Sequence, residues 1–351
     1  MKHYACMLLL FFGAPKIHAQ GDTIVQARII EDENQLANKA YNDGIEKMNG
    51  KQFQAAIDAF SQAIQLKADM HLAYFNRAIC KMDVKQFDEA ILDFQKTNEL
   101  NPSAENAFYI GQVYQMKDDK QKAIQHYSNA LALKSDYAQV YYYRGGMYFQ
   151  LDSMQLALAD FNQAIQYKSD YGYAFNDRAS TKLQLNDLNG AIEDYKKASQ
   201  LHPESPYILN NLGSALRKKG LFKEAITSYN KALMLKKDYA IALNNRASCF
   251  LELNDLKNAT SDLNQAIEID SKYSLAYVNR AAVFYKLKDY KSSEADLTKA
   301  IQIDPTNGYA YLNRGIAREM LRDDSGACSD WLQAKKMGIE TAKSYAGHCA
   351  E

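Results

Sequence analysis

The sequence predicts an all-α solenoid of nine tandem helix-turn-helix repeats, and three observations support this prediction. A short apolar phrase recurs at a nearly constant interval, small residues recur at fixed positions within each copy, and large side chains alternate with them. The phrase has the form Ala-Ile-x-x-Phe-x-x-Ala, and its first residue stands at Ala56, Ala90, Ala123, Ala157, Ala191, Ala225, Ala259, Ser293 and Ala327. Successive copies are 34 residues apart, except for one interval of 33. Such a period is typical of arrays in which each unit buries its apolar face against the next.

Each copy contains two segments with helical apolar spacing, separated by a polar turn such as Asn186-Asp187. The first segment carries a small residue at one position: Gly44, Ala78, Gly111, Gly145, Ala179, Gly213, Ala247, Ala281 and Gly315. The second carries a large one: Phe60, Phe94, Tyr127, Phe161, Tyr195, Tyr229, Leu263, Leu297 and Trp331. Two antiparallel helices approach closely only where one lacks bulk, so these positions are expected to face each other. Pro102, Pro203 and Pro305 fall between copies, where a helix must end.

This pattern resembles the tetratricopeptide repeat family over about 305 of the 351 residues. The resemblance implies a right-handed superhelix whose concave face is lined by the first helix of each repeat. The predicted organisation is a linker or helix at residues 20–36, nine repeats at 37–341 and a capping helix at 342–351. A cap is expected because the last repeat would otherwise expose its apolar face.

The first nineteen residues have the features of a secretory signal peptide. Lys2 and His3 precede an apolar run from Tyr4 to Ala14, and a small residue, Ala19, precedes Gln20. The run is too short to span a bilayer, and no later segment is apolar enough to do so. The Ala-Gln junction resembles signal peptides of the Bacteroidota group. We therefore expect an exported protein, periplasmic or secreted, although a buried N-terminal strand or helix is the alternative.

Arginine precedes the small position in six repeats, and aspartate precedes the large position in the same six. The arginines are Arg77, Arg144, Arg178, Arg246, Arg280 and Arg314, and the aspartates are Asp93, Asp160, Asp194, Asp262, Asp296 and Asp330. A carboxylate matches the guanidinium fork, so we predict a structural ion pair between the two helices of each of these repeats. A basic ladder for an anionic ligand is the alternative, and duplication of repeats could also explain the co-occurrence.

Asparagine stands immediately before that arginine position in six repeats, as Asn42, Asn76, Asn211, Asn245, Asn279 and Asn313, with Tyr109, Tyr143 and Asp177 in the other three. An amide both donates and accepts, so one per repeat could clamp the backbone of an extended peptide. The column resembles the asparagine ladder of the O-linked N-acetylglucosamine transferases, whose catalytic domain has no counterpart here. Alternatively, these amides bond only to neighbouring helix ends. Tyr109, Tyr142, Tyr143 and Tyr173 interrupt the ladder and could stack on a side chain or a sugar, or simply pack.

Four cysteines remain beyond residue 19. Cys80 and Cys249 occupy a position where alanine is expected, which predicts burial. Cys328 and Cys349 lie symmetrically about a predicted turn at Gly338-Ile339, so an antiparallel hairpin would bring their sulfur atoms together. In an exported protein this favours a disulfide, and two free thiols are the alternative.

Nothing in the sequence indicates catalysis. The histidines are scattered, and no phosphate-binding loop, nucleophile elbow or zinc-protease motif is present, so no enzyme activity, metal, cofactor or small-molecule substrate is expected. Lys plus Arg and Asp plus Glu both total 42, and the absence of a basic stripe argues against nucleic acid. The predicted function is a protein-protein interaction scaffold that holds an extended peptide or partner domain in its concave groove. The alternatives are a structural subunit of a cell-envelope assembly, bound through edges or the convex face, and carbohydrate binding through the tyrosines.

Overall fold

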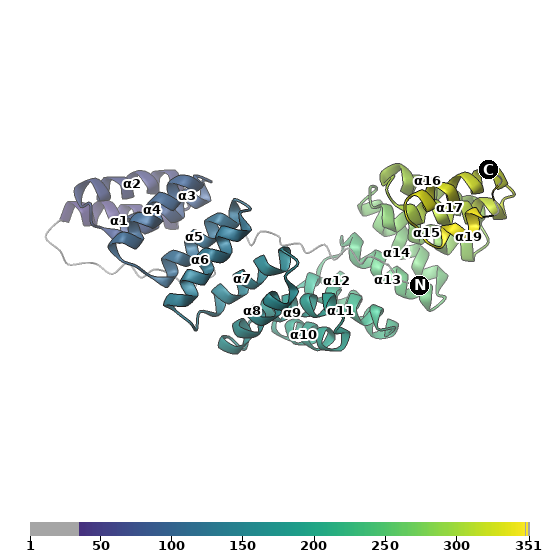
Figure 1. Cartoon of the computed structure of the whole chain (residues 1–351), viewed down its shortest axis with the longest axis horizontal. Helices are drawn as coiled ribbons and strands as arrows, with labels where there is room; N and C mark the ends of the chain where they lie inside the picture. The colour runs from purple at the N-terminus through teal and green to yellow at the C-terminus, as the bar shows by residue number, and fades with distance from the viewer. Residues whose placement is uncertain (1–34, 348, 350–351) are drawn as a thin grey trace. The chain divides into compact units, whose positions relative to one another are not determined.

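The computed structural model describes residues 35–347 and 349. The predicted signal segment at residues 1–19 and most of the predicted linker at 20–36 therefore lie outside the described residues. The described part contains nineteen α-helices and no strand, which confirms the all-α prediction. The chain divides into two compact units, residues 1–136 and 137–351, and the helices of each are coloured in chain order in Figure 1.

Each repeat forms an antiparallel pair of helices. In the first unit the helices are α1 (Gln35–Asn49), α2 (Phe53–Leu66), α3 (His71–Asp83), α4 (Phe87–Leu100), α5 (Ala104–Met116) and α6 (Lys120–Leu133). In the second they are α7 (Ala138–Gln150), α8 (Met154–Tyr167), α9 (Gly172–Gln184), α10 (Leu188–Leu201), α11 (Pro206–Lys218), α12 (Phe222–Leu235), α13 (Ala240–Glu252), α14 (Leu256–Ile269), α15 (Ser274–Lys286), α16 (Tyr290–Ile303), α17 (Gly308–Met320), α18 (Asp324–Lys336) and α19 (Ala342–Ala346). Within each unit, a helix packs most extensively against its partner in the same repeat.

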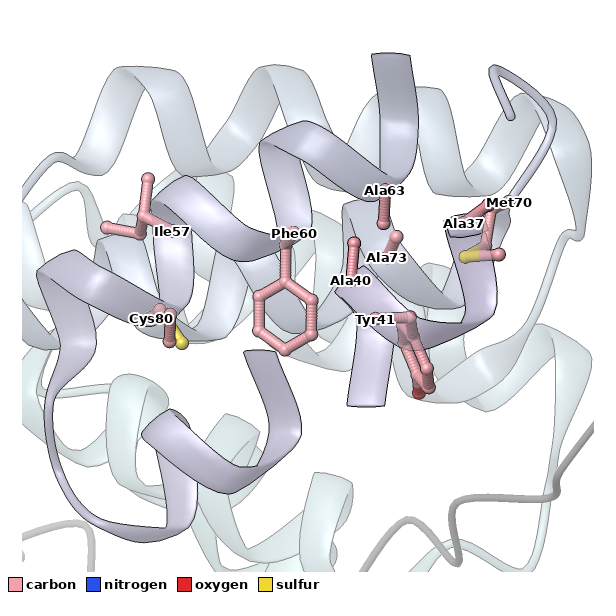
Figure 2. Close-up of a cluster of buried hydrophobic side chains, with 10 residues drawn as sticks. Ala37, Ala40, Tyr41, Ile57, Phe60, Ala63, Met70, Ala73 and Cys80 are labelled. Atoms are coloured by element: carbon pink, nitrogen blue, oxygen red, sulfur yellow. The ribbon is translucent and has the colours of Figure 1, made fainter. Parts of the chain in front are cut away.

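The small and large positions meet as their spacing predicts. A Cβ atom added to Gly44 would lie 2.6 Å from the Phe60 ring, and one added to Gly213 would lie 2.7 Å from the Tyr229 ring. Both rings are fully buried. Figure 2 shows this packing in the first repeats, with the Phe60 ring at the centre of a cluster that includes Tyr41, Ala63 and Cys80. The two helices of each repeat thus approach each other closely, and this close packing excludes water from the core.

The turn inside each described repeat has a common geometry. One residue of each turn adopts a positive φ: Lys51, Lys85, Asp118, Asp152, Asn186, Gly220, Asn254, Lys288 and Arg322. In five repeats the next residue is an aspartate that caps the second helix by accepting a hydrogen bond from the backbone N–H three residues on: Asp119, Asp187, Asp255, Asp289 and Asp323. The residue with positive φ reverses the direction of the chain, and the capping aspartate marks the start of the second helix.

First helices lie closer to one another than second helices do. In the second unit, α7 contacts α9, α11 contacts α13, and α13 contacts α15, whereas no contact of comparable extent joins successive second helices. Stacked pairs with this asymmetry bend toward the side on which the helices are closer. The first helices of this unit therefore form its inner face, which we call the first-helix face.

The last repeat is covered by a short helix. α19 begins at the predicted position, residue 342, but it ends at Ala346 and is five residues long, so it is shorter than the predicted range of 342–351. Ala342 and Ala346 are buried against Trp331 and Leu312, and Tyr345 lies 5.1 Å from Trp331 between ring centroids. This helix shields apolar surface that the ninth repeat would otherwise expose.

Candidate binding face

The six arginine–aspartate pairs are in contact in the structure. In each, the arginine on the first helix donates from Nε and Nη2 to the two carboxylate oxygens on the second helix, at 2.6–2.8 Å. All six aspartates are buried. Bidentate geometry of this kind is the strong form of the arginine–carboxylate interaction. Each guanidinium is therefore neutralised inside its own repeat, which gives the alternative of a basic ladder no geometric support.

The same arginines also reach the preceding repeat, a contact that the sequence analysis missed. The third nitrogen, Nη1, donates to a side-chain oxygen on the preceding second helix in five repeats: Arg77 to Ser61, Arg178 to Asn162, Arg246 to Asn230, Arg280 to Asn264 and Arg314 to Thr298. The signal was present in the sequence, because each acceptor stands 16 residues before its arginine. The equivalent acceptor positions hold Gln95, which stands 15 residues before Ile110, and Lys196, which stands 16 residues before Leu212. Each of the five arginines thus joins three helices.

Three amides of the predicted asparagine ladder bond between successive repeats through their nitrogen atoms. In the second unit, Nδ2 of Asn211 donates to Oδ1 of Asn176 at 3.2 Å. Equivalent bonds run from Asn245 to Asn210 at 3.1 Å and from Asn279 to Asn244 at 2.7 Å. The acceptors stand one position before the ladder column, and the sequence signal for them is the repeated pairs Asn210-Asn211 and Asn244-Asn245. These bonds hold successive first helices in register.

The remaining ladder positions differ from one another. In the first unit, Asn76 is buried and its Nδ2 donates to the Tyr41 hydroxyl at 2.8 Å. Asn42 is exposed and Asn313 is partly buried, and neither forms a side-chain hydrogen bond within the described part of the chain. The oxygens Oδ1 of Asn211, Asn245 and Asn279 accept no hydrogen bond there and are not buried. Those three oxygens remain available to a ligand.

The four predicted tyrosines are divided between the two units, with Tyr109 in the first and Tyr142, Tyr143 and Tyr173 in the second. Tyr109 belongs to the first unit, where it packs against Phe75 at 5.3 Å and Phe94 at 5.9 Å between ring centroids. Tyr173 is 50% exposed and stacks on His202 at 4.4 Å. Tyr142 and Tyr143 contact each other at 5.5 Å. Tyr109 thus packs against two phenylalanine rings, and Tyr142 and Tyr143 form a cluster in the second unit.

That cluster is completed by residues of the next repeat. Tyr171, which precedes α9, lies 4.9 Å from Tyr142 between ring centroids, and the Tyr142 hydroxyl donates a hydrogen bond to the carboxylate of Asp177. Asn176 Nδ2 also donates to Asp177 Oδ1, at 2.8 Å. Burial raises the pKa of Asp177 to about 6, although the hydrogen bonds from Asn176 and Tyr142 act in the opposite direction. The Asn176 amide thus lies between Asp177 and Asn211, and its Oδ1 accepts the first bond of the ladder.

The cysteines divide into two classes. Cys328 on α18 and Cys349 beyond α19 form a disulfide, with Cα atoms 5.5 Å apart. The chain reverses between them at Gly338, whose φ is +82°. Cys80 and Cys249 are buried free thiols, and burial raises the pKa of each to about 12. A thiol that stays protonated at neutral pH is a poor nucleophile and a poor metal ligand.

No group of three or more His, Cys, Asp or Glu side chains in the described part of the chain is placed to hold a metal ion. Among the same residues, no helix has the length and apolar character that crossing a bilayer would need.

Known protein families match this chain in the region of its repeats. A family model described as TPR repeat matches residues 179–220 and 213–254, and models described as tetratricopeptide repeat match residues 110–172, 240–273 and 274–307. These matches together span 192 of the 351 residues. A search of curated proteins found no match.

Solved structures with a similar fold were also found. The Cut9–Hcn1 hetero-tetramer of APC/C is 14% identical, with 90% of this chain and 76% of that chain covered and a TM-score of 0.58. A tetratricopeptide repeat protein from Parabacteroides merdae is 16% identical, with coverages of 72% and 97% and a TM-score of 0.53. PilF of Pseudomonas aeruginosa is 18% identical, with coverages of 60% and 97% and a TM-score of 0.53. At these identities the likeness establishes the fold alone.

Proposed function

Because this chain belongs to the tetratricopeptide repeat family, we propose that it is a non-catalytic scaffold that binds an extended peptide or a partner domain on the first-helix face. The observation that carries the proposal is the set of oxygens Oδ1 of Asn211, Asn245 and Asn279, which stand one per repeat and accept no hydrogen bond. Each amide is already held by its Nδ2 bond to the preceding repeat. A backbone N–H of an extended peptide could therefore bond to an oxygen whose orientation is set in advance.

Apolar side chains on the same helices add area for contact. Tyr207, Leu275 and Tyr309 lie near the starts of α11, α15 and α17 and are 46%, 45% and 41% exposed. Scattered exposed apolar residues are ordinary, but the same position on three first helices of one unit offers repeated contacts along this face. A peptide could place alternate side chains against this series while its backbone follows the amides.

Export to the periplasm or the exterior is a second part of the proposal. The charge, apolar and small-residue pattern of residues 1–19 supports it, and so does the disulfide between Cys328 and Cys349, since such bonds persist in oxidising compartments. N-terminal sequencing of the protein from its native source should give Gln20 as the first residue. A mature protein that begins at Met1 would contradict this part.

A structural role in an envelope assembly is the second candidate, and it would use the outer surface. Met234 on α12 and Leu156 on α8 are 79% and 52% exposed, and both lie on second helices. A subunit bound through that surface would tolerate changes on the first-helix face. Carbohydrate binding through a wall of tyrosines has less support, because Tyr109 packs against Phe75 and Phe94.

Affinity capture from native extracellular and periplasmic fractions, analysed by mass spectrometry, tests the proposal. The bait with Asn211, Asn245, Asn279 and Asn313 changed to alanine should lose partners that the unchanged protein retains. A matched control replaces the exposed polar residues Asp170 and Lys288, which lie outside the ladder, with alanine and leaves the amides and the bonds that orient them unchanged. Loss of partners from the first variant alone supports peptide binding on the first-helix face. Retention of all partners by both contradicts it, and a Met234→Ser, Leu156→Ser variant would then test the second helices.

A further inference from the structure

Asp177 is the one charged residue in the ladder column of the second unit. An asparagine there could accept the same two hydrogen bonds, from the Tyr142 hydroxyl and the Asn176 amide, and asparagine occupies the column at Asn211, Asn245 and Asn279. The negative charge is therefore not needed to hold the repeats together. Placing a charge in a partly buried position without a counter-ion opposes folding. A residue that opposes folding without serving the packing points to a role in binding.

No cation of the described chain neutralises this carboxylate. Arg178, the next residue of α9, is bonded to Asp194 and Asn162, and Lys182, one turn further on, pairs with Asp194 at 2.8 Å. Lys168 lies over the Tyr171 ring, with Nζ 5.3 Å from the centroid, and forms no ion pair with Asp177. Each of the six buried aspartates on the second helices, in contrast, has its own arginine. Asp177 does not.

The surroundings of Asp177 suit an organic cation. The rings of Tyr142, Tyr143 and Tyr171 cluster beside it, and the centroid of Tyr142 lies 5.5 Å from that of Tyr143 and 4.9 Å from that of Tyr171. The faces of aromatic rings attract ammonium and guanidinium groups. An ionised carboxylate has about four acceptor positions, and only two are used here. All four residues are partly exposed.

The position of the cluster connects it to the ladder. Asn211 bonds to Asn176, which in turn bonds to Asp177, so the cluster lies one repeat before the first free amide oxygen. We infer that Asp177, Tyr142, Tyr143 and Tyr171 form a specificity site for a lysine or arginine side chain of the peptide that binds the first-helix face. This inference rests on the proposed function and deepens it, because it assigns a positive charge to one position of the partner.

Binding of synthetic peptides tests the inference. An immobilised array of twelve-residue peptides with varied flanking residues would carry Lys, Arg, norleucine or Glu at the central position, and it would be probed with the full mature chain at neutral pH. We expect the unchanged protein to prefer the cationic versions by tenfold or more, and Asp177→Asn to reduce this preference to less than twofold. Asp170→Asn, which removes an exposed carboxylate from the neighbouring turn, should retain the preference.

A second probe separates this inference from the proposed function. Nα-acetyl-lysine methylamide, which keeps its side-chain ammonium, would be titrated into protein with ¹³C-labelled tyrosines. The tyrosine chemical shifts would be followed by NMR. Shifts that depend on Asp177 support the inference even if no peptide binds, in which case peptide binding as a function fails. Peptide binding without a preference for cations, or with a preference that survives Asp177→Asn, overturns the inference and leaves the function standing. No peptide binding together with no Asp177-dependent shift overturns both.

Discussion

At the scale of single residues, one column of this protein combines two roles that the sequence does not separate. The asparagines of the ladder use their amide nitrogens to join repeats and keep their oxygens free. Asp177 occupies the same column but carries a negative charge when ionised. Burial raises the pKa of this carboxyl to about 6, so the folded state holds a proton at a pH where the unfolded chain has released it.

The sign of the resulting pH dependence follows from that shift. An acid whose pKa is higher in the folded state stabilises the fold below its unfolded pKa, and this contribution is lost as pH rises through the folded pKa near 6. Asp177→Asn should therefore raise the free energy of unfolding at pH 7.5 by about 1–2 kcal/mol, after allowance for partial exposure. The gain should shrink toward pH 4. Urea unfolding at several pH values measures it, with Asp170→Asn as the control. A loss of stability at pH 7.5 would contradict the prediction.

At the scale of elements, each repeat depends on a reversal of the chain and on a bond between its two helices. The reversal places one residue at positive φ, where a side chain costs about 1 kcal/mol and glycine costs least. In the described repeats only Gly220 is glycine, and Lys51, Lys85 and Lys288 accept the strain without an asparagine or aspartate side chain. Strain is tolerated at the turn because packing of the flanking helices determines the backbone there.

A substitution at one turn tests this account. Lys288 has φ +63° and is exposed, so Lys288→Gly should stabilise the protein by about 0.5–1 kcal/mol through relief of strain. Gly220→Ala should destabilise it by a similar amount, because Gly220 has φ +83°, a conformation that is unfavourable for alanine. An added Cβ there meets no atom within 4 Å, so steric contact does not contribute. Thermal unfolding of both variants measures the effect. Opposite signs would show that steric contacts, and not backbone conformation, decide the outcome.

The arginine–aspartate bond is the second feature of the element. Arg246 bonds to Asp262 in its own repeat and to Asn230 in the preceding one. Because Asp262 is buried and Arg246 is partly exposed, removing either partner leaves the other incompletely satisfied. A double-mutant cycle with Arg246→Ala and Asp262→Ala should give a coupling energy of about 1–3 kcal/mol. Coupling below about 0.3 kcal/mol would mean that the pair contributes no more than an exposed surface bridge.

At the scale of the whole molecule, a repeat array must close its ends, and the C-terminal end is closed by α19 and a disulfide. α19 has only five residues, too few to be stable as an isolated helix. Its position depends on burial of Ala342 and Ala346 against the ninth repeat and on the bond from Cys349 to Cys328. The disulfide thus holds in place a cap that packing alone would retain weakly.

Reduction of that disulfide is expected to open the end of the array. For a sequence separation of 21 residues, the loss of cross-linking should cost about 3 kcal/mol. Hydrogen exchange in the presence and absence of a reductant should show faster exchange in α17 to α19, with residues 35–136 unchanged. Cys349→Ser should reproduce the effect and respond no further to the reductant. Equal protection of α17 to α19 in both conditions would show that packing alone holds the capping helix in place.

Much of the architecture could be predicted from sequence because its signals are local and repeated. The period of the apolar phrase, the facing small and large positions, the arginine–aspartate pairing and the symmetry of Cys328 and Cys349 about Gly338 all follow from spacing within one repeat or one hairpin. The bonds from arginine to the preceding repeat and from Asn211 to Asn176 were missed. They depend on how one repeat stacks on the next, so no single repeat reveals them.

The sequence by itself determined the class of fold, the number of repeats and the faces that each helix buries, since periodic burial of apolar surface leaves one solution. Only the tertiary structure decided which polar side chains form contacts within the protein and are therefore not available to a ligand. It placed Tyr109 in an aromatic contact, gave the asparagine nitrogens to the preceding repeat and, among the described residues, left Asp177 without a cation. The physical reason is that a hydrogen bond or an ion pair requires particular atoms within about 3 Å, and that distance is set by the packing of neighbouring repeats.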